Sequence, residues 1–283
     1  MALRKIAALC IFLCLQTTTF FAVAATAENA QKLSYEIVRE LPHEPLHFTQ
    51  GLIVKSGRFL ESIGLYGHSA LLEKDVESGR TLRRYALPSS IFGEGVTQLH
   101  DRIHLLSWRE RVGFVFDTRF RLQKKFRYEG EGWGLTTDNR ALIVSDGTPE
   151  LRFMDPETHA VIRRLLVRDG GQPVARLNEL EYAHGWILAN IWYSDSIALI
   201  DPDDGHIGAW LDLHALRARM SADLSSDPDK VLNGIAFDDR TDHLYVTGKF
   251  WPRVFELRLA WPPRRESTNA ADPPESAPGR TFR

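Results

Sequence analysis

The side chains in this sequence that could do chemistry stand at the beginning of short apolar runs or just beyond their ends. Those near the beginning of a run are Phe48, Gln50, Phe92, Glu94, Trp133, Asn178, Glu179, Glu181 and Asn233. Those just beyond the following run are Trp108, Trp192, Lys249 and Trp251. Together they make an aromatic cup with a few carboxylates, amides and one ammonium, which is typical of pockets that bind small organic groups. Any single tryptophan fits a hydrophobic core equally well, whereas three or more at one mouth favour a site.

Two of these groups have an ordinary alternative. Glu94 lies between Gly93 and Gly95, which allow a tight backbone turn, so it could be a surface turn carboxylate. A lysine is by default solvated, but the apolar Phe250 that follows Lys249 makes burial of Lys249 equally plausible.

A short phrase that recurs five times would bring these residues together. Its copies are Gln50-Gly51-Leu52, Glu94-Gly95-Val96, Trp133-Gly134-Leu135, Glu179-Leu180-Glu181 and Asn233-Gly234-Ile235, and their middle residues lie 44, 39, 46 and 54 positions apart. A repeat of this length in a β-rich chain is the spacing of propeller blades. Because the innermost strand of each blade lines the central channel, we expect the five phrases to deliver their side chains to one mouth.

Each phrase opens a hairpin, and a third strand then ends in an aspartate that begins the next turn. These aspartates are Asp75, Asp117, Asp155 and Asp201. Four strands in each repeat predict an all-β, five-bladed β-propeller. The fifth repeat lacks an outer strand, so we expect the run Leu33–Leu41 to complete the last blade and close the ring. One helical pattern, Leu213–Leu224, lengthens the connection between the fourth and fifth repeats.

The two ends of the chain fall outside the predicted propeller domain, residues 33–259. Residues 1–27 have the basic, apolar and small-residue order of a secretory signal peptide, with cleavage after Ala24 or Ala27. An uncleaved membrane anchor is the alternative, although the apolar stretch is short for a bilayer. Residues 260–283 contain almost no large apolar side chain and are predicted to be disordered.

Both cysteines, Cys10 and Cys14, lie in the predicted leader, so the mature protein would have no thiol. Removing the leader leaves 33 basic and 37 acidic residues, a net charge of −4. No basic stripe suggests a nucleic-acid partner. We therefore expect a periplasmic or secreted protein without disulfides.

Two histidine pairs invite a metal interpretation that the sequence does not favour. His43-Glu44-Pro45-Leu46-His47 matches the zinc-protease pattern in letters, but that motif requires a helix and the prolines oppose one. His100 and His104 flank a predicted hairpin turn, and we expect both to be exposed.

At the residues of the recurring phrases, the sequence resembles the plant-type glutaminyl cyclases, which also occur in bacteria and are called glutamine cyclotransferases. The matching segments are Phe48–Leu52, Gly93–Thr97, Gly132–Leu135, Ser145–Gly147, Leu177–Tyr182, Asn233–Ala236 and Thr247–Pro252. They follow one another in order through nearly the whole predicted domain. The resemblance implies a five-bladed propeller that converts the N-terminal glutamine of a peptide into pyroglutamate, releases ammonia, and uses neither a metal nor another cofactor.

The resemblance also implies roles for nine residues. The catalytic ones are Glu94, Lys249, Asn178 and Gln50, and the substrate-binding ones are Phe48, Phe92, Trp108, Trp133 and Trp192. Glu94 would take a proton from the α-amine and return it to the departing NH2. Lys249, with amide donors of Gln50 or Asn178, would hold the carboxamide oxygen as it becomes negative.

Two other functions stay open at this stage. The first is a non-catalytic periplasmic propeller that binds peptides or proteins, because a fold does not fix a function. The second is a propeller lactonase or hydrolase, which needs a metal cage; Glu94, Asn178, Glu179, Glu181 and Asn233 could supply one. For a cyclase the expected partners are peptides or proteins with an N-terminal glutamine, the default state is a monomer, and no membrane is involved once the leader is removed.

Overall fold

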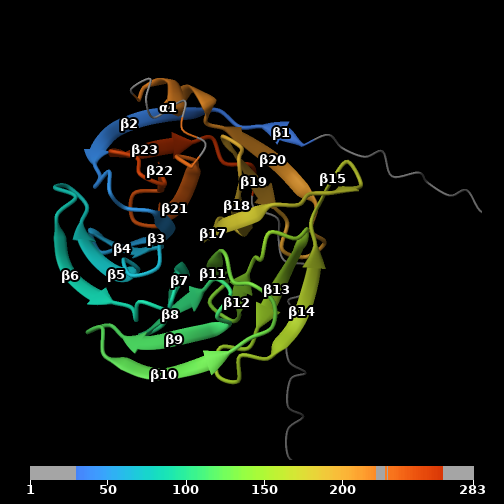
Figure 1. Cartoon of the computed structure of the whole chain (residues 1–283). Helices are drawn as coiled ribbons and strands as arrows, with labels where there is room; N and C mark the ends of the chain where they lie inside the picture. The colour runs from blue at the N-terminus through green and yellow to red at the C-terminus, as the bar shows by residue number, and fades with distance from the viewer. Residues whose placement is uncertain (1–29, 221–226, 228, 264–283) are drawn as a thin grey trace, which may run out of the picture.

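Five blades, each of four antiparallel strands, surround a central axis and form a β-propeller (Figure 1). The computed structural model describes residues 30–220, 227 and 229–263. The predicted fold class is confirmed. The predicted leader and nearly all of the predicted tail lie outside the described residues.

The strands follow from the centre outward within each blade. The first blade has β3 (Thr49–Lys55), β4 (Arg58–Ile63), β5 (Ala70–Asp75) and β6 (Thr81–Ala86). The second has β7 (Gly93–Leu99), β8 (Arg102–Ser107), β9 (Val112–Asp117) and β10 (Leu122–Arg127). The third has β11 (Leu135–Thr137), β12 (Leu142–Val144), β13 (Glu150–Met154) and β14 (Val161–Leu166). A short ribbon of β15 (Arg168–Asp169) and β16 (Gln172–Pro173) follows it.

The last two blades include strands from the beginning of the chain. The fourth has β17 (Leu177–Ala183), β18 (Trp186–Ile191), β19 (Ser196–Ile200) and β20 (Ile207–Asp212), and β1 (Gln31–Lys32) pairs with β20 in parallel. The fifth has β21 (Leu232–Asp238), β22 (His243–Gly248), β23 (Arg253–Leu259) and, outermost, β2 (Tyr35–Pro42).

The ring closes as the sequence predicted. β2 pairs antiparallel with β23, with Tyr35 opposite Leu259, so the N-terminal run supplies the outer strand that the fifth repeat lacks. β1 was not predicted and precedes the expected start of the domain at residue 33. A two-residue strand has no periodicity from which it could be recognised.

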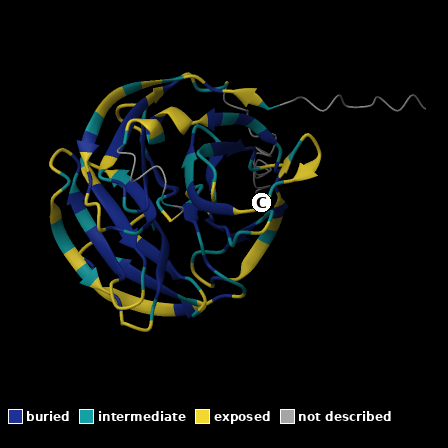
Figure 2. Ribbon diagram, turned by 45° about the horizontal axis from the view of Figure 1, so that its top comes forward, coloured by how far each residue is buried: buried dark blue, intermediate teal, exposed yellow. Residues whose placement is uncertain are grey.

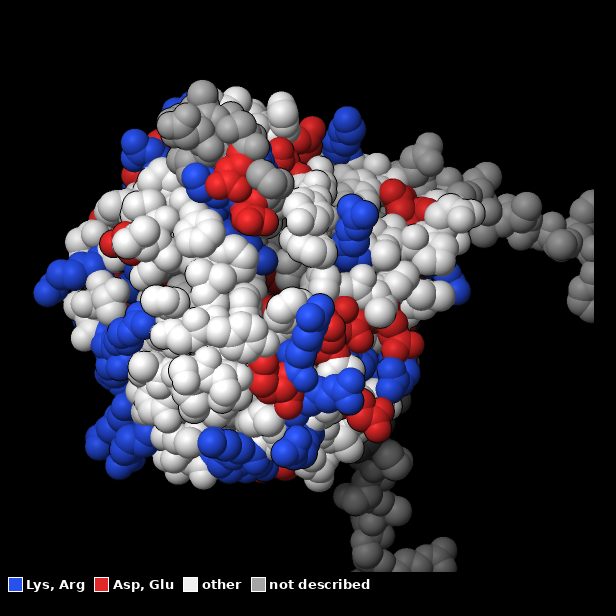
Figure 3. Space-filling view, viewed as in Figure 1, with Lys and Arg blue, Asp and Glu red and all other residues white. Residues whose placement is uncertain are grey.

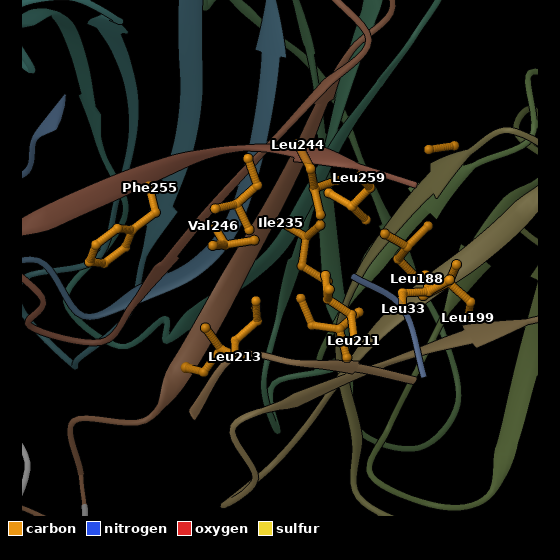
Figure 4. Packing of buried hydrophobic residues seen from close by; sticks show 14 of the residues in the cluster. Leu33, Leu188, Leu199, Leu211, Leu213, Ile235, Leu244, Val246, Phe255 and Leu259 are labelled. Carbon is orange, nitrogen blue, oxygen red and sulfur yellow. The ribbon is translucent and has the colours of Figure 1, made fainter. Parts of the chain in front are cut away.

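Burial decreases from the axis to the periphery (Figure 2). All residues of β7 but one are buried, whereas all residues of β10 but one are exposed. The blades stack face to face through apolar side chains: Leu199, Leu211, Ile235, Leu244 and Leu259 belong to one cluster that joins the fourth and fifth blades (Figure 4). Because each blade buries both faces against its neighbours, the inner strands are held rigidly around the channel.

The predicted turn aspartates do what their position suggested. Backbone N–H groups donate to Asp75 Oδ1 from Ser78 (3.0 Å) and to Asp155 Oδ1 from Thr158 (2.7 Å). Asp117 and Asp201 accept in the same way. Each carboxylate replaces a backbone partner that the turn cannot provide.

Two predictions need correction. The helix α1 (His214–Ala218) is shorter than the predicted Leu213–Leu224; Leu213 and Leu216 are buried in the core, and Leu224 lies outside the described residues. His104 is buried rather than exposed, because its side chain on β8 points between the second and third blades toward His159.

In the view of Figure 3, basic and acidic side chains are mixed at the right and the top, basic ones predominate along the left and lower edges, and uncharged atoms cover much of the middle. Within the described part of the chain, no helix is long and apolar enough to cross a membrane.

Candidate active site

Strand direction explains why the candidate residues meet at one mouth. In each hairpin the first residue of the inner strand lies beside the last residue of the next strand: Thr49 pairs with Ile63, and Gly93 pairs with Ser107. Side chains that precede an inner strand and side chains that follow the second strand therefore reach the same end of the channel.

All nine predicted site residues line one cavity of about 240 Å³ at this mouth. The lining consists of Phe48, Gln50, Leu65, Phe92, Glu94, Trp108, Trp133, Asn178, Trp192 and Lys249. Only Leu65 was not singled out from the sequence. It lies two residues after β4, whereas Trp108, Trp192 and Lys249 each lie one residue after their strands, so the equivalent position in the first blade is Gly64 and Leu65 follows it.

The glycines of the recurring phrase allow the inner strands to approach one another. A Cβ on Gly95 would lie 2.5 Å from the backbone nitrogen of Leu135, and a Cβ on Gly134 would lie 2.0 Å from the carbonyl oxygen of Asn178. Neither distance is possible for a side chain, so any larger residue would push the blades apart. The phrase therefore sets the width of the channel as well as the positions of its polar side chains.

Glu94, on β7, is 4% exposed. The side-chain amide of Gln50 donates to its Oε1 at 2.9 Å. Burial raises the pKa of Glu94 well above its usual value; the Lys249 ammonium opposes this rise, and the carboxylates of Glu110 and Glu131 add to it. A buried carboxyl group with a raised pKa holds a proton more readily than a solvated one, which suits general acid–base catalysis.

Lys249 follows β22 and is 6% exposed. Its ammonium lies 4.6 Å from the centre of the Phe48 ring, and its backbone N–H donates to the carbonyl oxygen of Val231 at 2.9 Å. Burial lowers the pKa of Lys249 to about 8, although the carboxylates of Glu94 and Asp229 act in the opposite direction. The cavity thus contains one buried carboxyl group, Glu94, and one buried amine, Lys249.

The aromatic wall is anchored by a carboxylate that the sequence analysis missed. The indole N–H groups of Trp108 and Trp133 both donate to Glu131 Oε2, at 2.7 and 3.0 Å. Trp133 and Trp192 are in edge-to-face contact with ring centres 5.3 Å apart. Burial opposes ionisation of Glu131, but hydrogen bonds from Trp133, Trp108 and Arg109 lower its pKa. The sequence does offer one indication of this role, because Glu131 stands only two residues before Trp133.

Four residues that the sequence suggested for the same cavity lie elsewhere. Asn233 lies behind the lining, where its amide donates to the carbonyl oxygen of Thr49 at 2.9 Å. Trp251 is 1% exposed, belongs to the core between the fourth and fifth blades, and donates to the carbonyl oxygen of Lys230. Its large ring fills space between the blades, so for Trp251 the alternative of a hydrophobic core position is correct.

Glu179 and Glu181 are the other two. Glu179 is buried and accepts the backbone N–H groups of Leu52 (3.2 Å) and Ile235 (2.8 Å), so it ties three inner strands together. Glu181 lines a separate hollow beside Lys55, at the opposite ends of the inner strands. The metal cage considered for a lactonase would need Glu179 and Glu181 close to Glu94. Among the described residues, these three carboxylates do not form such a group.

The fold and the cavity together define a class of protein: a five-bladed propeller with a buried carboxylate and a buried amine in an aromatic cup at one mouth of its channel. The chain belongs to the glutamine cyclotransferase family, whose sequence profile matches residues 7–259. It is 41% identical over 230 residues to a glutaminyl-peptide cyclotransferase of Arabidopsis thaliana, an alignment that covers 79% of this chain and 71% of that protein. The crystal structure of the Myxococcus xanthus glutaminyl cyclase superposes with a TM-score of 0.76 at 38% identity, covering 81% of this chain and 98% of that one.

Proposed function

We propose that this protein is a glutaminyl-peptide cyclotransferase that converts the N-terminal glutamine of peptides to pyroglutamate and releases ammonia. The observation that carries the proposal is the buried pair of Glu94 and Lys249 in an aromatic cavity of a chain that belongs to this family. The cavity, about 240 Å³, is smaller than the 300–1,000 Å³ or so of pockets for drug-sized ligands. That size suits the end of a peptide better than a longer segment.

The reaction joins two groups of the same residue. The α-amine nitrogen attacks the γ-carboxamide carbon, a C–N bond closes a five-membered ring, and the carbonyl oxygen takes the electron pair. The pair then returns, the bond to the amide nitrogen breaks, and that nitrogen leaves as ammonia after gaining a proton. Because the nucleophile and the carbonyl carbon are tethered, the enzyme needs only to orient them and move one proton.

Glu94 moves that proton. Its carboxylate takes a proton from the attacking amine, and the raised pKa lets it retain the proton until the leaving nitrogen accepts it. The hydrogen bond from Gln50 fixes one carboxylate oxygen and leaves the other for the substrate. Gln50 is therefore assigned to the orientation of Glu94 instead of to the carboxamide oxygen.

Lys249 and Asn178 stabilise the negative oxygen. Both line the cavity, and the Lys249 ammonium is held over Phe48 with few competing contacts to water. A donor in such a dry site is stronger than the same donor in water. Asn178 supplies the neutral second donor.

The five aromatic residues Phe48, Phe92, Trp108, Trp133 and Trp192 exclude water and hold the glutamine side chain. Glu131 fixes two of the rings through their indole N–H groups. The apolar enclosure also produces the burial that shifts the pKa values of Glu94 and Lys249.

We also propose the arrangement and location that the sequence suggested. Residues 1–27 are a secretory signal peptide and residues 33–259 are the catalytic domain. The predicted tail begins too early at residue 260, because the Trp261 ring packs against His184 and Phe237. The mature protein is a monomer in the periplasm or outside the cell.

The deciding experiment measures ammonia and pyroglutamate from glutaminyl-alanine with purified protein, with and without a chelator. We expect stoichiometric release of both products, unaffected by the chelator, and none from the N-acetylated dipeptide, which has no free amine. Binding of the dipeptide without release of ammonia would overturn the proposal and favour the peptide-binding propeller. Loss of activity with the chelator would contradict metal-independent chemistry.

A further inference from the structure

A buried ionic cluster lies behind the wall of the cavity, where the first and fifth blades meet. We call Glu61, His43, His47, Thr49 and Lys74 the Glu61 cluster. Every member is at most 9% exposed, and Glu61 on β4 is fully buried. The two histidines do not share a helix, as Pro42 and Pro45 predicted, and they lie in a turn before β3.

Four donors surround the two oxygens of Glu61. Oε1 accepts from the Thr49 hydroxyl (2.7 Å) and lies 3.0 Å from His43 Nε2. Oε2 accepts from the Lys74 ammonium (2.9 Å) and lies 3.1 Å from His47 Nδ1. A carboxylate has about four lone-pair directions, so this one is saturated.

The ring of His43 has an acceptor at each of its two nitrogens. Its Nδ1 lies 2.6 Å from the carbonyl oxygen of Trp251, which can only accept, so Nδ1 carries a hydrogen. Burial raises the pKa of Glu61, but the nearby Lys74 and His43 outweigh it and hold that pKa well below its usual value. The His43 ring thus bridges Glu61 and the Trp251 carbonyl.

His43 and His47 hold the loop that contains Lys249, residues 249–252, at three points. His43 Nδ1 donates to the Trp251 carbonyl, and the backbone N–H of His43 donates to the carbonyl oxygen of Pro252 at 3.0 Å. The carbonyl oxygen of His47 accepts the N–H of Phe250 at 2.7 Å. Phe250 has a φ of 59°, a left-handed conformation that a bulky residue adopts only when its surroundings impose it.

We propose that His43 and Glu61 are positioning residues of the active site, which hold the 249–252 loop so that the Lys249 ammonium points into the cavity. The inference rests on the proposed function. The same segment, residues 43–48, ends in Phe48, the ring over which that ammonium lies. One buried carboxylate therefore fixes both the lysine and its aromatic support.

The three ligand-type residues His43, His47 and Glu61 are also the one set of histidine and acidic groups within the described residues that could hold a metal ion. The Lys74 ammonium, 2.9 Å from Glu61 Oε2, already supplies a positive charge there. The saturated carboxylate favours an ionic cluster over a metal site, and the experiment below separates the two.

The test compares His43→Ala, His43→Asn and Leu60→Ala with the wild type at a temperature where all are folded. Leu60 precedes Glu61 on β4 and faces the second blade, so Leu60→Ala makes a cavity in the same strand without touching the cluster. Asn places an amide donor near the position of Nδ1 and retains the bond to the Trp251 carbonyl. Each variant is measured for kcat, KM, the pH dependence of kcat, melting temperature and bound metal.

We expect His43→Ala to lower kcat by about 10- to 100-fold with little change in KM, because a displaced lysine acts on the transition state. In His43→Ala the alkaline midpoint of the pH profile of kcat should also move. His43→Asn should recover part of the lost kcat. Leu60→Ala should change neither kcat nor the midpoint. Unchanged kcat in His43→Ala, or an equal loss in Leu60→Ala, would overturn the proposal. So would a stoichiometric metal that His43→Ala removes.

A readout without turnover separates this inference from the proposed function. Hydrogen exchange at the Phe250 amide, which donates to His47, should accelerate in His43→Ala and stay slow in Leu60→Ala. If the wild type releases no ammonia, the proposed function fails, and the amide measurement still decides whether the cluster holds the loop. Unchanged exchange in His43→Ala would refute that.

Discussion

At the scale of single residues, burial makes the pKa values of Glu94 and Lys249 more similar than those of a solvated carboxyl group and a solvated amine. The pKa of Glu94 is raised and that of Lys249 is lowered to about 8, both chiefly by loss of water. The α-amine of a free peptide has a pKa of about 7.7–8.0. The raised pKa of Glu94 therefore lowers the cost of proton transfer among the amine, Glu94 and the leaving nitrogen, while Lys249 keeps its charge up to about its own pKa.

The first prediction concerns alkaline pH. Because the Lys249 ammonium is required and its pKa is about 8, kcat should fall as the pH rises through about 8. Lys249→Met should lower kcat by about 100-fold and abolish that alkaline limb, since one oxyanion donor is worth about 100- to 1,000-fold. The check is a pH series of ammonia release with Lys249→Arg, which stays charged, as the partner variant. An alkaline limb that persists in Lys249→Met would exclude the lysine as its origin.

Sequence reasoning located the residues of the cavity but not all their contacts. Residues such as Phe48 and Trp192 could be assigned because each stands at a fixed place relative to a repeated strand. Glu131 stands two residues before Trp133, as Phe48 stands two residues before Gln50, but its role depends on where two indole N–H groups point, which the spacing does not tell.

At the scale of elements, irregular pairing at the mouth aims the side chains. Four of the five inner strands have a register shift there: between Thr49 and Gly51, Gly93 and Val96, Leu177 and Leu180, and Leu232 and Ile235. Such bulges redirect consecutive side chains, so simple alternation does not tell which neighbour faces the cavity. This is why Asn178 lines it while the adjacent Glu179 turns to the backbone of other blades.

The second prediction concerns the contact between the second and third blades. His104 and His159 are buried there with ring centres 5.8 Å apart, and the His159 ring stacks on Phe126. Burial lowers the pKa of each to about 4, and for His104 the neighbouring His159 lowers it further. Their pKa values in the folded state lie below the value of about 6.5 in the unfolded chain.

Protonation therefore favours unfolding. The stability that neutral His104 contributes is fully present above about pH 6.5 and is lost as the pH falls toward 4. Urea unfolding at pH 7 and pH 4.5 should show that His104→Leu reduces the acid-induced loss of stability by about 2 kcal/mol. An equal loss in the variant and the wild type would show that His104 is not responsible.

At the scale of the whole molecule, closure of the ring holds the two halves of the site together. Lys249 comes from the fifth blade and Phe48 from the entry to the first, and β2, which precedes Phe48 in the chain, completes the fifth blade. Leu41 on β2 is buried in a cluster with residues of both blades, including Leu52 and Val254. The N-terminal strand is thus a structural part of the active site although it contributes no lining residue.

The third prediction tests that closure. Leu41→Ala should lower the free energy of unfolding by about 2–5 kcal/mol, as for other leucines removed from a core. Ile162→Ala, on the outermost strand of the third blade and 63% exposed, should change it by less than about 0.5 kcal/mol. Equal effects in urea unfolding would show that β2 is not held by its buried face.

The overall architecture was the most predictable part of the protein. The recurring glycine phrase, the hairpin patterns and the missing outer strand of the fifth repeat are each visible in a short stretch of sequence. Together they are compatible with one arrangement, a closed ring of five blades. The Glu61 cluster was not predictable, because it joins His43 to Glu61 and to a carbonyl more than 200 positions away, and no local pattern encodes that meeting.

The measurement that bears most directly on the function compares Glu94→Gln and Glu181→Gln with the wild type in ammonia release from glutaminyl-alanine. Both changes replace a carboxylate of the channel by an amide, but Glu181 lies at the opposite mouth. We predict that Glu94→Gln keeps the melting temperature and loses about 100-fold or more in kcat, while Glu181→Gln retains kcat within about threefold. Near-normal turnover by Glu94→Gln would contradict the proton transfer through Glu94 and the mechanism that depends on it.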